Sequence, residues 1–185
     1  MNSKYVAYRR ACPSDYEGMV KLQRANFINN LSAAEALDGF LSIEYTEEQF
    51  EEINNDAGIA VALSDGELVG YLCGASCGYS RQFPILNAVV RQFSNKTIRE
   101  RGMTEANTFV YGPVCIGRSF RGTGVLQGLY KTIKEIAGPR YGHCVLFISD
   151  RNPRSLSAHL RLGMRNLGTF EFNGKSFHLL CAAIG

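Results

Sequence analysis

Residues 117–124, Gly-Arg-Ser-Phe-Arg-Gly-Thr-Gly, place three glycines and fixed positive charge between an apolar run and a run with helical spacing. Glycines ahead of a helix let successive amide N–H groups turn toward one anion, and the helix dipole adds to the attraction. Arg121 would supply a permanent charge at the mouth of such a cradle. The segment therefore favours a polyphosphate-binding turn. A tight turn that needs glycine for positive φ and binds nothing is the alternative.

Two common phosphate-binding motifs do not fit this segment. A P-loop ends in Gly-Lys-Ser/Thr, whereas Gly124 is followed by Val125 and Leu126. A dinucleotide fingerprint needs a third glycine at position 127, which is Gln127, and no acidic residue follows about 20 residues later. The sequence therefore disfavours both nucleotide hydrolysis and dinucleotide binding.

Strands and helices alternate in an order that predicts one α/β or α+β domain, spanning residues 1–185, with a largely mixed sheet. Ser14 with Glu17 and Thr46 with Gln49 have capping-box spacing. Pro113 lies inside an apolar run, which indicates an edge, a bulge or a position without a ladder partner. Strands are expected at 4–11, 58–63, 68–75, 108–116, 143–149, 164–170 and 176–184, and helices at 13–27, 47–53, 124–138 and 153–163.

The connection formed by residues 77–107 is longer than most connections in compact domains. Its apolar part, 83–93, predicts a helix after Pro84, and 94–107 is polar and reads as a loop. We expect this segment to pack over one side of the cleft as a lid. A helix that only covers the sheet is the alternative.

The composition is that of a compact globular chain: 45% of the 185 residues are hydrophobic, 20% are charged, and the net charge is +3. The basic residues are scattered, so we expect no nucleic-acid partner. No signal core or membrane-length apolar run occurs, so we expect a cytoplasmic protein with no membrane association. The six cysteines contain no C-x-x-C pair, so we expect reduced thiols and no metal.

The chain resembles the GNAT superfamily of N-acetyltransferases over most of its length. Arg121-Gly122-Thr123-Gly124 is similar to the first part of the family's Gln/Arg-x-x-Gly-x-Gly/Ala acetyl-CoA motif, with Leu126 where a small residue is usual. Residues 152–164 resemble the block in which an Asn precedes a helix ending in Leu-Gly-Phe, and 164–181 resemble the closing hairpin. The resemblance implies a mixed, mostly antiparallel seven-stranded sheet flanked by helices, whose central fourth and fifth strands splay apart.

The resemblance also implies where acetyl-CoA, as acetyl donor, would bind. Its pantetheine arm would lie between the splayed strands and pair with backbone groups like an extra strand. Its pyrophosphate would lie on the amides of the glycine turn. The residues implied for the pantetheine arm are Val114, Cys115, Ile116, Asn152 and Ser155, and those for pyrophosphate are Arg121, Gly122, Thr123, Gly124, Val125 and Leu126.

Three side chains are candidates for the chemistry that acetyl transfer requires. Glu44, beside aromatic and apolar residues, is a candidate base, with a solvated loop charge as the alternative. Tyr111 could hold an ordered water or only pack in the core. His159 stands four residues before Gly163, where many family members carry a tyrosine that protonates the leaving thiolate. Its alternative is packing between Leu156 and Leu162.

The resemblance thus implies an acetyl-CoA-dependent N-acetyltransferase acting on a primary amine of a small molecule or peptide, and we expect a monomer or homodimer. The alternative is a CoA-binding or sensor module without catalysis. Transfer of labelled acetyl groups to any amine separates the two.

Overall fold

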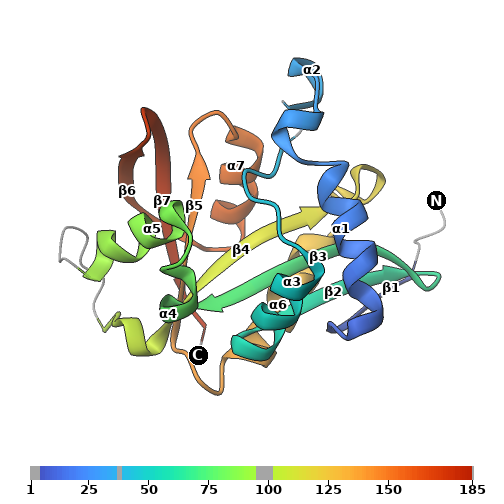
Figure 1. Ribbon diagram of the computed structural model, residues 1–185, viewed down its shortest axis with the longest axis horizontal. Coiled ribbons are helices and arrows are strands. Elements are labelled where there is room, and N and C mark those ends of the chain that lie inside the picture. The colour runs from blue at the N-terminus through green and yellow to red at the C-terminus, as the bar shows by residue number, and fades with distance from the viewer. Residues whose placement is uncertain (1–4, 37–38, 95–101, 185) are drawn as a thin grey trace.

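The computed structural model describes residues 5–36, 39–94 and 102–184. Within these residues, seven strands form one sheet in the order β1-β2-β3-β4-β5-β7-β6 (Figure 1). Neighbouring strands are antiparallel except for β4 and β5, which are parallel. This confirms the expected mixed, mostly antiparallel sheet. The strands are β1 (Val6–Arg10), β2 (Gly58–Ser64), β3 (Glu67–Ser76), β4 (Thr108–Ile116), β5 (His143–Ser149), β6 (Arg165–Phe172) and β7 (Lys175–Ala183).

The sheet opens between β4 and β5, as expected. Their pairing ends at Val110 and Val145, yet β4 continues along β3 to Ile116 and β5 continues along β7 to Ser149. The register of β4 against β3 shifts opposite Gly112 and Pro113, which is the irregularity that the proline predicted. A wedge-shaped gap therefore separates the second halves of two central strands, and the two strands diverge in Figure 1.

Helices cover both faces of the sheet (Figure 1). On one face, α6 packs against β1, β2 and β3, and α7 packs against β5. On the other face, α1 packs on β3 and β4, α3 packs on β2 and β3, and α5 packs on β5 and β6. The helices are α1 (Tyr16–Arg24), α2 (Ala33–Ala36), α3 (Glu47–Asp56), α4 (Cys77–Ser80), α5 (Pro84–Ser94), α6 (Val125–Ala137) and α7 (Pro153–Arg161).

The buried side chains follow the amphipathic patterns of these elements. Val125, Leu129 and Ile133 of α6 form one buried stripe against the sheet, as their spacing predicts. In β5, Leu146 and Ile148 face α6 and α7, whereas Val145 and Phe147 face α5. The gap between β4 and β5 is thus accessible to side chains from both faces.

Gly128 on α6 has a packing role. A Cβ atom built there would lie 2.1 Å from the Tyr8 ring, so glycine lets the helix approach β1 closely. Gly128 therefore fixes the height of α6, and with it the glycine turn, above the sheet.

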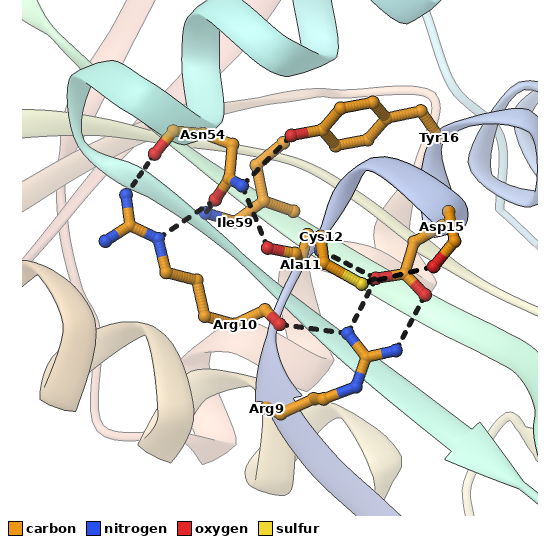
Figure 2. A network of polar contacts seen from close by, with 9 residues as sticks. Arg9, Arg10, Ala11, Cys12, Asp15, Tyr16, Asn54 and Ile59 are labelled. Carbon is orange, nitrogen blue, oxygen red and sulfur yellow. Dashed lines mark hydrogen bonds and ion pairs between the residues drawn. The ribbon is translucent and has the colours of Figure 1, made fainter.

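The N-terminal region is tied to α3 by Asn54 (Figure 2). The Asn54 amide donates to the Ala11 carbonyl at 2.9 Å and to the Tyr16 hydroxyl at 3.1 Å. Its oxygen accepts the Ile59 amide at 3.1 Å. Because every polar group of this buried side chain has a partner, the contacts hold β1, α1, α3 and β2 together.

One capping prediction is confirmed and one is wrong. Thr46 Oγ1 accepts the Gln49 amide and Gln49 Oε1 accepts the Thr46 amide, a complete capping box on α3. The box expected from Ser14 and Glu17 does not form, because residues 13–15 make a 3₁₀ turn and α1 begins at Tyr16. The buried Asp15 carboxylate instead accepts hydrogen bonds from the Cys12 amide and from the two terminal guanidinium nitrogens of Arg9 (Figure 2). An ionised carboxylate accepts hydrogen bonds more strongly than a hydroxyl.

The segment 77–107 contains the helix predicted after Pro84, α5, and also the short helix α4, which the sequence reading missed. Val89, Val90 and Phe93 of α5 are buried against the sheet, while Leu86 reaches the gap between the strands. Residues 95–101 of the expected polar loop lie outside the described residues. Farther on, Glu105 to Asn107 form a 3₁₀ turn.

Candidate functional site

A cavity of about 360 Å³, here called the larger cavity, lies between β4, the start of α6 and α7. Its size is in the range of small-molecule sites. It brings together ten of the residues predicted from the sequence: Val114, Cys115, Ile116, Arg121, Gly122, Gly124, Leu126, Asn152, Ser155 and His159.

The glycine turn forms one end of the larger cavity. Gly122 has φ +78° and Gly124 has φ +93°, and a Cβ atom on either would meet nothing within 4 Å. The backbone conformation, not a lack of space, therefore requires glycine at both positions. Within the described residues, no backbone hydrogen bond engages the amides of 122–127. A row of donors at the positive end of α6 is thus available to an anion.

Thr123 and Val125 belong to this turn, but their side chains do not line the cavity. The Thr123 hydroxyl donates to the Phe120 carbonyl at 2.7 Å, and Val125 is buried in the core. Only their backbone amides can serve the role that the sequence predicted. Leu126 is half-buried and lies in the cavity wall.

Arg121 braces the turn. Its Nε donates to the Ile116 carbonyl at 3.0 Å and its Nη2 donates to the Asn26 side-chain oxygen at 2.6 Å. These contacts tie the glycine turn to the end of β4 and to the residues after α1. The guanidinium still lines the larger cavity, so its charge acts there from a fixed position.

On the free edge of β4, the backbone amide and carbonyl groups of every second residue point into the gap. Because the Gly117 amide donates to Val69 of β3 at 2.8 Å, alternation along the strand turns Cys115 toward β3 as well. Val114 and Ile116 then face the gap, where the Ile116 carbonyl already accepts from Arg121. The expectation that all three residues offer backbone groups to one ligand is therefore wrong for Cys115, whose backbone pairs with Tyr71.

Asn152 joins α7 to the segment that follows α2. Its side-chain oxygen accepts the Ser155 amide at 3.2 Å, which caps α7, and its Nδ2 donates to the Phe40 carbonyl at 3.5 Å. Asn152 is buried and lines both the larger cavity and the neighbouring pocket. The described segment from Gly39 to Leu41 thereby forms part of the cavity wall.

His159 lies where the larger cavity meets this neighbouring pocket. Its Nδ1 lies 2.8 Å from the Ser155 carbonyl, which can only accept, so Nδ1 carries the proton. Nε2 then presents a lone pair, and it is buried without a hydrogen-bond partner among the described residues. Burial lowers the pKa of this imidazole, which keeps it neutral near pH 7. The hydrogen bond to the Ser155 carbonyl acts to raise the pKa, but burial outweighs it, so the net shift is opposite to the one that a resting-state acid would require.

Tyr111 packs edge-on against His159, with ring centroids 5.5 Å apart at 87°. Its hydroxyl is buried and has no hydrogen-bond partner within the described part of the chain. Both unpartnered atoms belong to residues that line a pocket of about 90 Å³, here called the smaller pocket. Its wall also includes Phe40, Ile43, Leu86, Pro113 and Phe147. The wall of the smaller pocket therefore combines apolar side chains with residues that carry two buried, unpartnered polar atoms.

Glu44 is not where the sequence reading placed it. Its side chain is exposed and lines a separate surface hollow with Gln23 and Thr46, near the start of α3. The neighbouring Ser42 and Ile43 line the smaller pocket instead. Glu44 therefore lines neither the larger cavity nor the smaller pocket, and its position does not support the role of base.

Several wall residues were missed by the sequence reading. The larger cavity is also lined by three residues of α7: Arg154, Ala158 and Arg161. Their i, i+4, i+7 spacing places them on one face of the helix predicted at 153–163, so the sequence did contain a signal for them. Asn26, Phe40 and Leu86 come from distant segments, and nothing in their local sequence marks them.

Across the described residues, no three His, Cys, Asp or Glu side chains are grouped so that they could hold a metal ion. The described helices include none with the length and apolar character needed to cross a membrane.

Several solved structures share the fold of this chain at low sequence identity. Arabidopsis thaliana NAA60 in complex with acetyl-CoA has a TM-score of 0.66 at 16% identity, covering 97% of this chain and 99% of that chain. The putative acetyltransferase yncA from Salmonella typhimurium with its cofactor acetyl-CoA has a TM-score of 0.66 at 13% identity, covering 98% and 95%. An N-acetyltransferase from Staphylococcus aureus has a TM-score of 0.62 at 17% identity, covering 98% and 99%.

No curated protein sequence matches the chain. The sequence model of the acetyltransferase (GNAT) family matches residues 25–164, which include the glycine turn, both splayed strands and His159. The chain therefore belongs to the GNAT family of acetyltransferases.

Proposed function

We propose that this chain, as a single domain, transfers an acetyl group from acetyl-CoA to a primary amine. The observation that carries the proposal is the larger cavity, which joins a row of unengaged amides to the open edge of β4. A long ligand with an anionic end and an amide-bearing arm fits this combination of donors and free strand edge.

The pyrophosphate of acetyl-CoA binds the amides of 122–127 at the start of α6. Positive φ at Gly122 and Gly124 directs these amides to one side, and the helix dipole favours the charge. The cations at the cavity wall are Arg121, Arg154 and Arg161. Because CoA carries several negative charges, this positive wall also raises its rate of association.

The pantetheine arm lies in the gap between β4 and β5. Val114 offers its backbone amide and carbonyl on the free edge of β4, so the arm binds like an added strand. Asn152 and Ser155, at the start of α7, are the side chains that face the arm. The thioester then lies beside His159, where the two cavities meet.

His159 moves one proton during the reaction. Its Nε2 lone pair accepts the proton of the attacking amine as the N–C bond forms. The resulting imidazolium returns that proton to the sulfur as the C–S bond breaks, giving the acetylated amine and CoA thiol. Tyr111, whose hydroxyl has no partner among the described residues, donates a hydrogen bond to the developing oxyanion.

The test is acetyl transfer from acetyl-CoA to a panel of primary amines, with thiol release and product mass measured together. Thiol release that depends on an amine supports the proposal if the mass of that amine also increases. The expected increase is about 42 Da, the mass of the C₂H₂O that acetylation adds. Acetyl-CoA binding with no transfer to any amine overturns it and supports a non-catalytic CoA-binding module.

A further inference from the structure

We propose that the acceptor is a primary amine carried on an apolar alkyl or arylalkyl group, rather than a polycation. This inference rests on the proposed transferase function and concerns the smaller pocket. The pocket is the part of the gap between β4 and β5 that α5 and residues 40–43 border. It extends beyond the larger cavity, to which the arm of acetyl-CoA is assigned, so it can take a second substrate.

The wall of the smaller pocket on the α5 side is apolar. Leu86 of α5 is almost fully buried there, and Phe147 of β5 points to the same face. Phe40 and Ile43 approach from the segment before α3, and Pro113 comes from the irregular part of β4. These five side chains come from four separate parts of the chain and contact one space.

The polar groups of this pocket are neutral. They belong to Ser42, Tyr111, Ser149, Asn152, Ser155 and His159, and none of the described wall residues is an Asp, Glu, Lys or Arg. An amine with several ammonium groups would lose hydration on entering such a wall without gaining a carboxylate partner. An apolar group beside a single amine gains by leaving water there.

The same wall prepares the amine for attack. Burial in apolar surroundings disfavours the charged ammonium and so lowers the pKa of an amine. The neutral amine is the nucleophile, and Nε2 of His159, also in the wall of this pocket, has the lone pair that receives its proton during attack. Apolar surroundings thus serve both binding and reaction of a monoamine.

The experiment compares kcat/KM for phenethylamine and spermidine at saturating acetyl-CoA. The kcat/KM for phenethylamine should exceed that for spermidine by about tenfold or more. Burying an aromatic group favours binding by at least about a factor of ten in the equilibrium constant. The Ser42→Asp variant adds a carboxylate at an exposed wall position and should reduce this preference several-fold. Ser157→Asp, on the exposed side of α7 and outside both cavity walls, is the matched control and should leave the preference unchanged.

Equal or better use of spermidine by the unmodified chain would overturn the inference while leaving the transferase function intact. A preference that Ser42→Asp and Ser157→Asp change equally would also overturn it, because the smaller pocket would then not select the acceptor. If no amine is acetylated although acetyl-CoA binds, the proposed function fails and this inference falls with it.

Discussion

The two halves of the gap between β4 and β5 are built differently. The larger cavity uses backbone amides, two glycines at positive φ and arginines, most of them within the two segments 114–127 and 152–161. The smaller pocket uses apolar side chains from residues 40–43, 86, 111–114 and 146–149. A constant ligand such as CoA can be held by a local backbone motif, whereas a specific acceptor is selected by side chains that only the fold brings together.

The largest effect is expected from replacing His159, which lines both the larger cavity and the smaller pocket. His159→Phe should keep acetyl-CoA binding and lower kcat by about 10² to 10⁴, the loss typical of a missing proton-transfer group. Steady-state kinetics with acetyl-CoA titrated at fixed amine measures this effect. The wild-type kcat should also fall at acid pH, because protonated Nε2 cannot accept a proton; since burial lowers the pKa of His159, this fall should begin below the value of about 6.5 of a free imidazole.

His178→Phe is the matched control, since His178 lies on β7 outside both cavity walls. It should leave kcat and its pH profile unchanged. If His159→Phe turns over as fast as the unmodified protein, His159 is only a packing residue against Tyr111.

A smaller effect is expected from replacing Arg121, which lines only the larger cavity. Arg121→Ala should raise KM for acetyl-CoA about tenfold, the value of one charge-assisted hydrogen bond, and leave acceptor KM nearly unchanged. It should also lower the free energy of unfolding by about 1 to 3 kcal/mol, because Ile116 and Asn26 lose their donor. Kinetics and urea unfolding give the two numbers, and equal changes in both Michaelis constants would contradict the division into two halves.

The smallest effect concerns stability and pH. Burial gives His159 a lower pKa in the folded chain than the value of about 6.5 expected when unfolded. Below about pH 6.5 the unfolded chain therefore binds a proton that the folded chain does not, so stability is lost as the pH falls. His159→Phe should reduce the loss of unfolding free energy between pH 7.5 and pH 5.5. A loss of unchanged size in the variant would show that His159 is not responsible.

The sequence was informative where the backbone itself carries the pattern. Pro113 marked the irregular strand beside the gap, Gly122 and Gly124 marked the turn, and the spacing of Val125, Leu129 and Ile133 marked the helix after it. Each of these signals depends on neighbours within a few residues. They located the larger cavity because that cavity is built from local features.

The sequence was uninformative where distant segments meet. Glu44 has suitable neighbours in sequence, yet it is exposed on another surface, and Leu86 has no local mark although it lines the smaller pocket. Asp15, rather than Ser14, makes the capping hydrogen bond before α1, because Arg9 on the preceding strand holds the Asp15 carboxylate in place. Such outcomes depend on tertiary contacts that no local pattern records.

The central claim is that the glycine turn holds the anionic end of acetyl-CoA, and thermal unfolding of Gly124→Ala with and without acetyl-CoA tests it most directly. The unmodified protein should gain about 2.7 kcal/mol at a hundredfold excess over the dissociation constant, a rise of roughly 5 to 10 °C for a chain of this size. Gly174→Ala is the matched control, because Gly174 also has positive φ and open space for a Cβ atom but lies in the β6–β7 turn. The account predicts that both variants fold with similar small losses and that only Gly124→Ala loses most of the acetyl-CoA-dependent rise. A full rise in Gly124→Ala, or no rise in the unmodified protein, would contradict it.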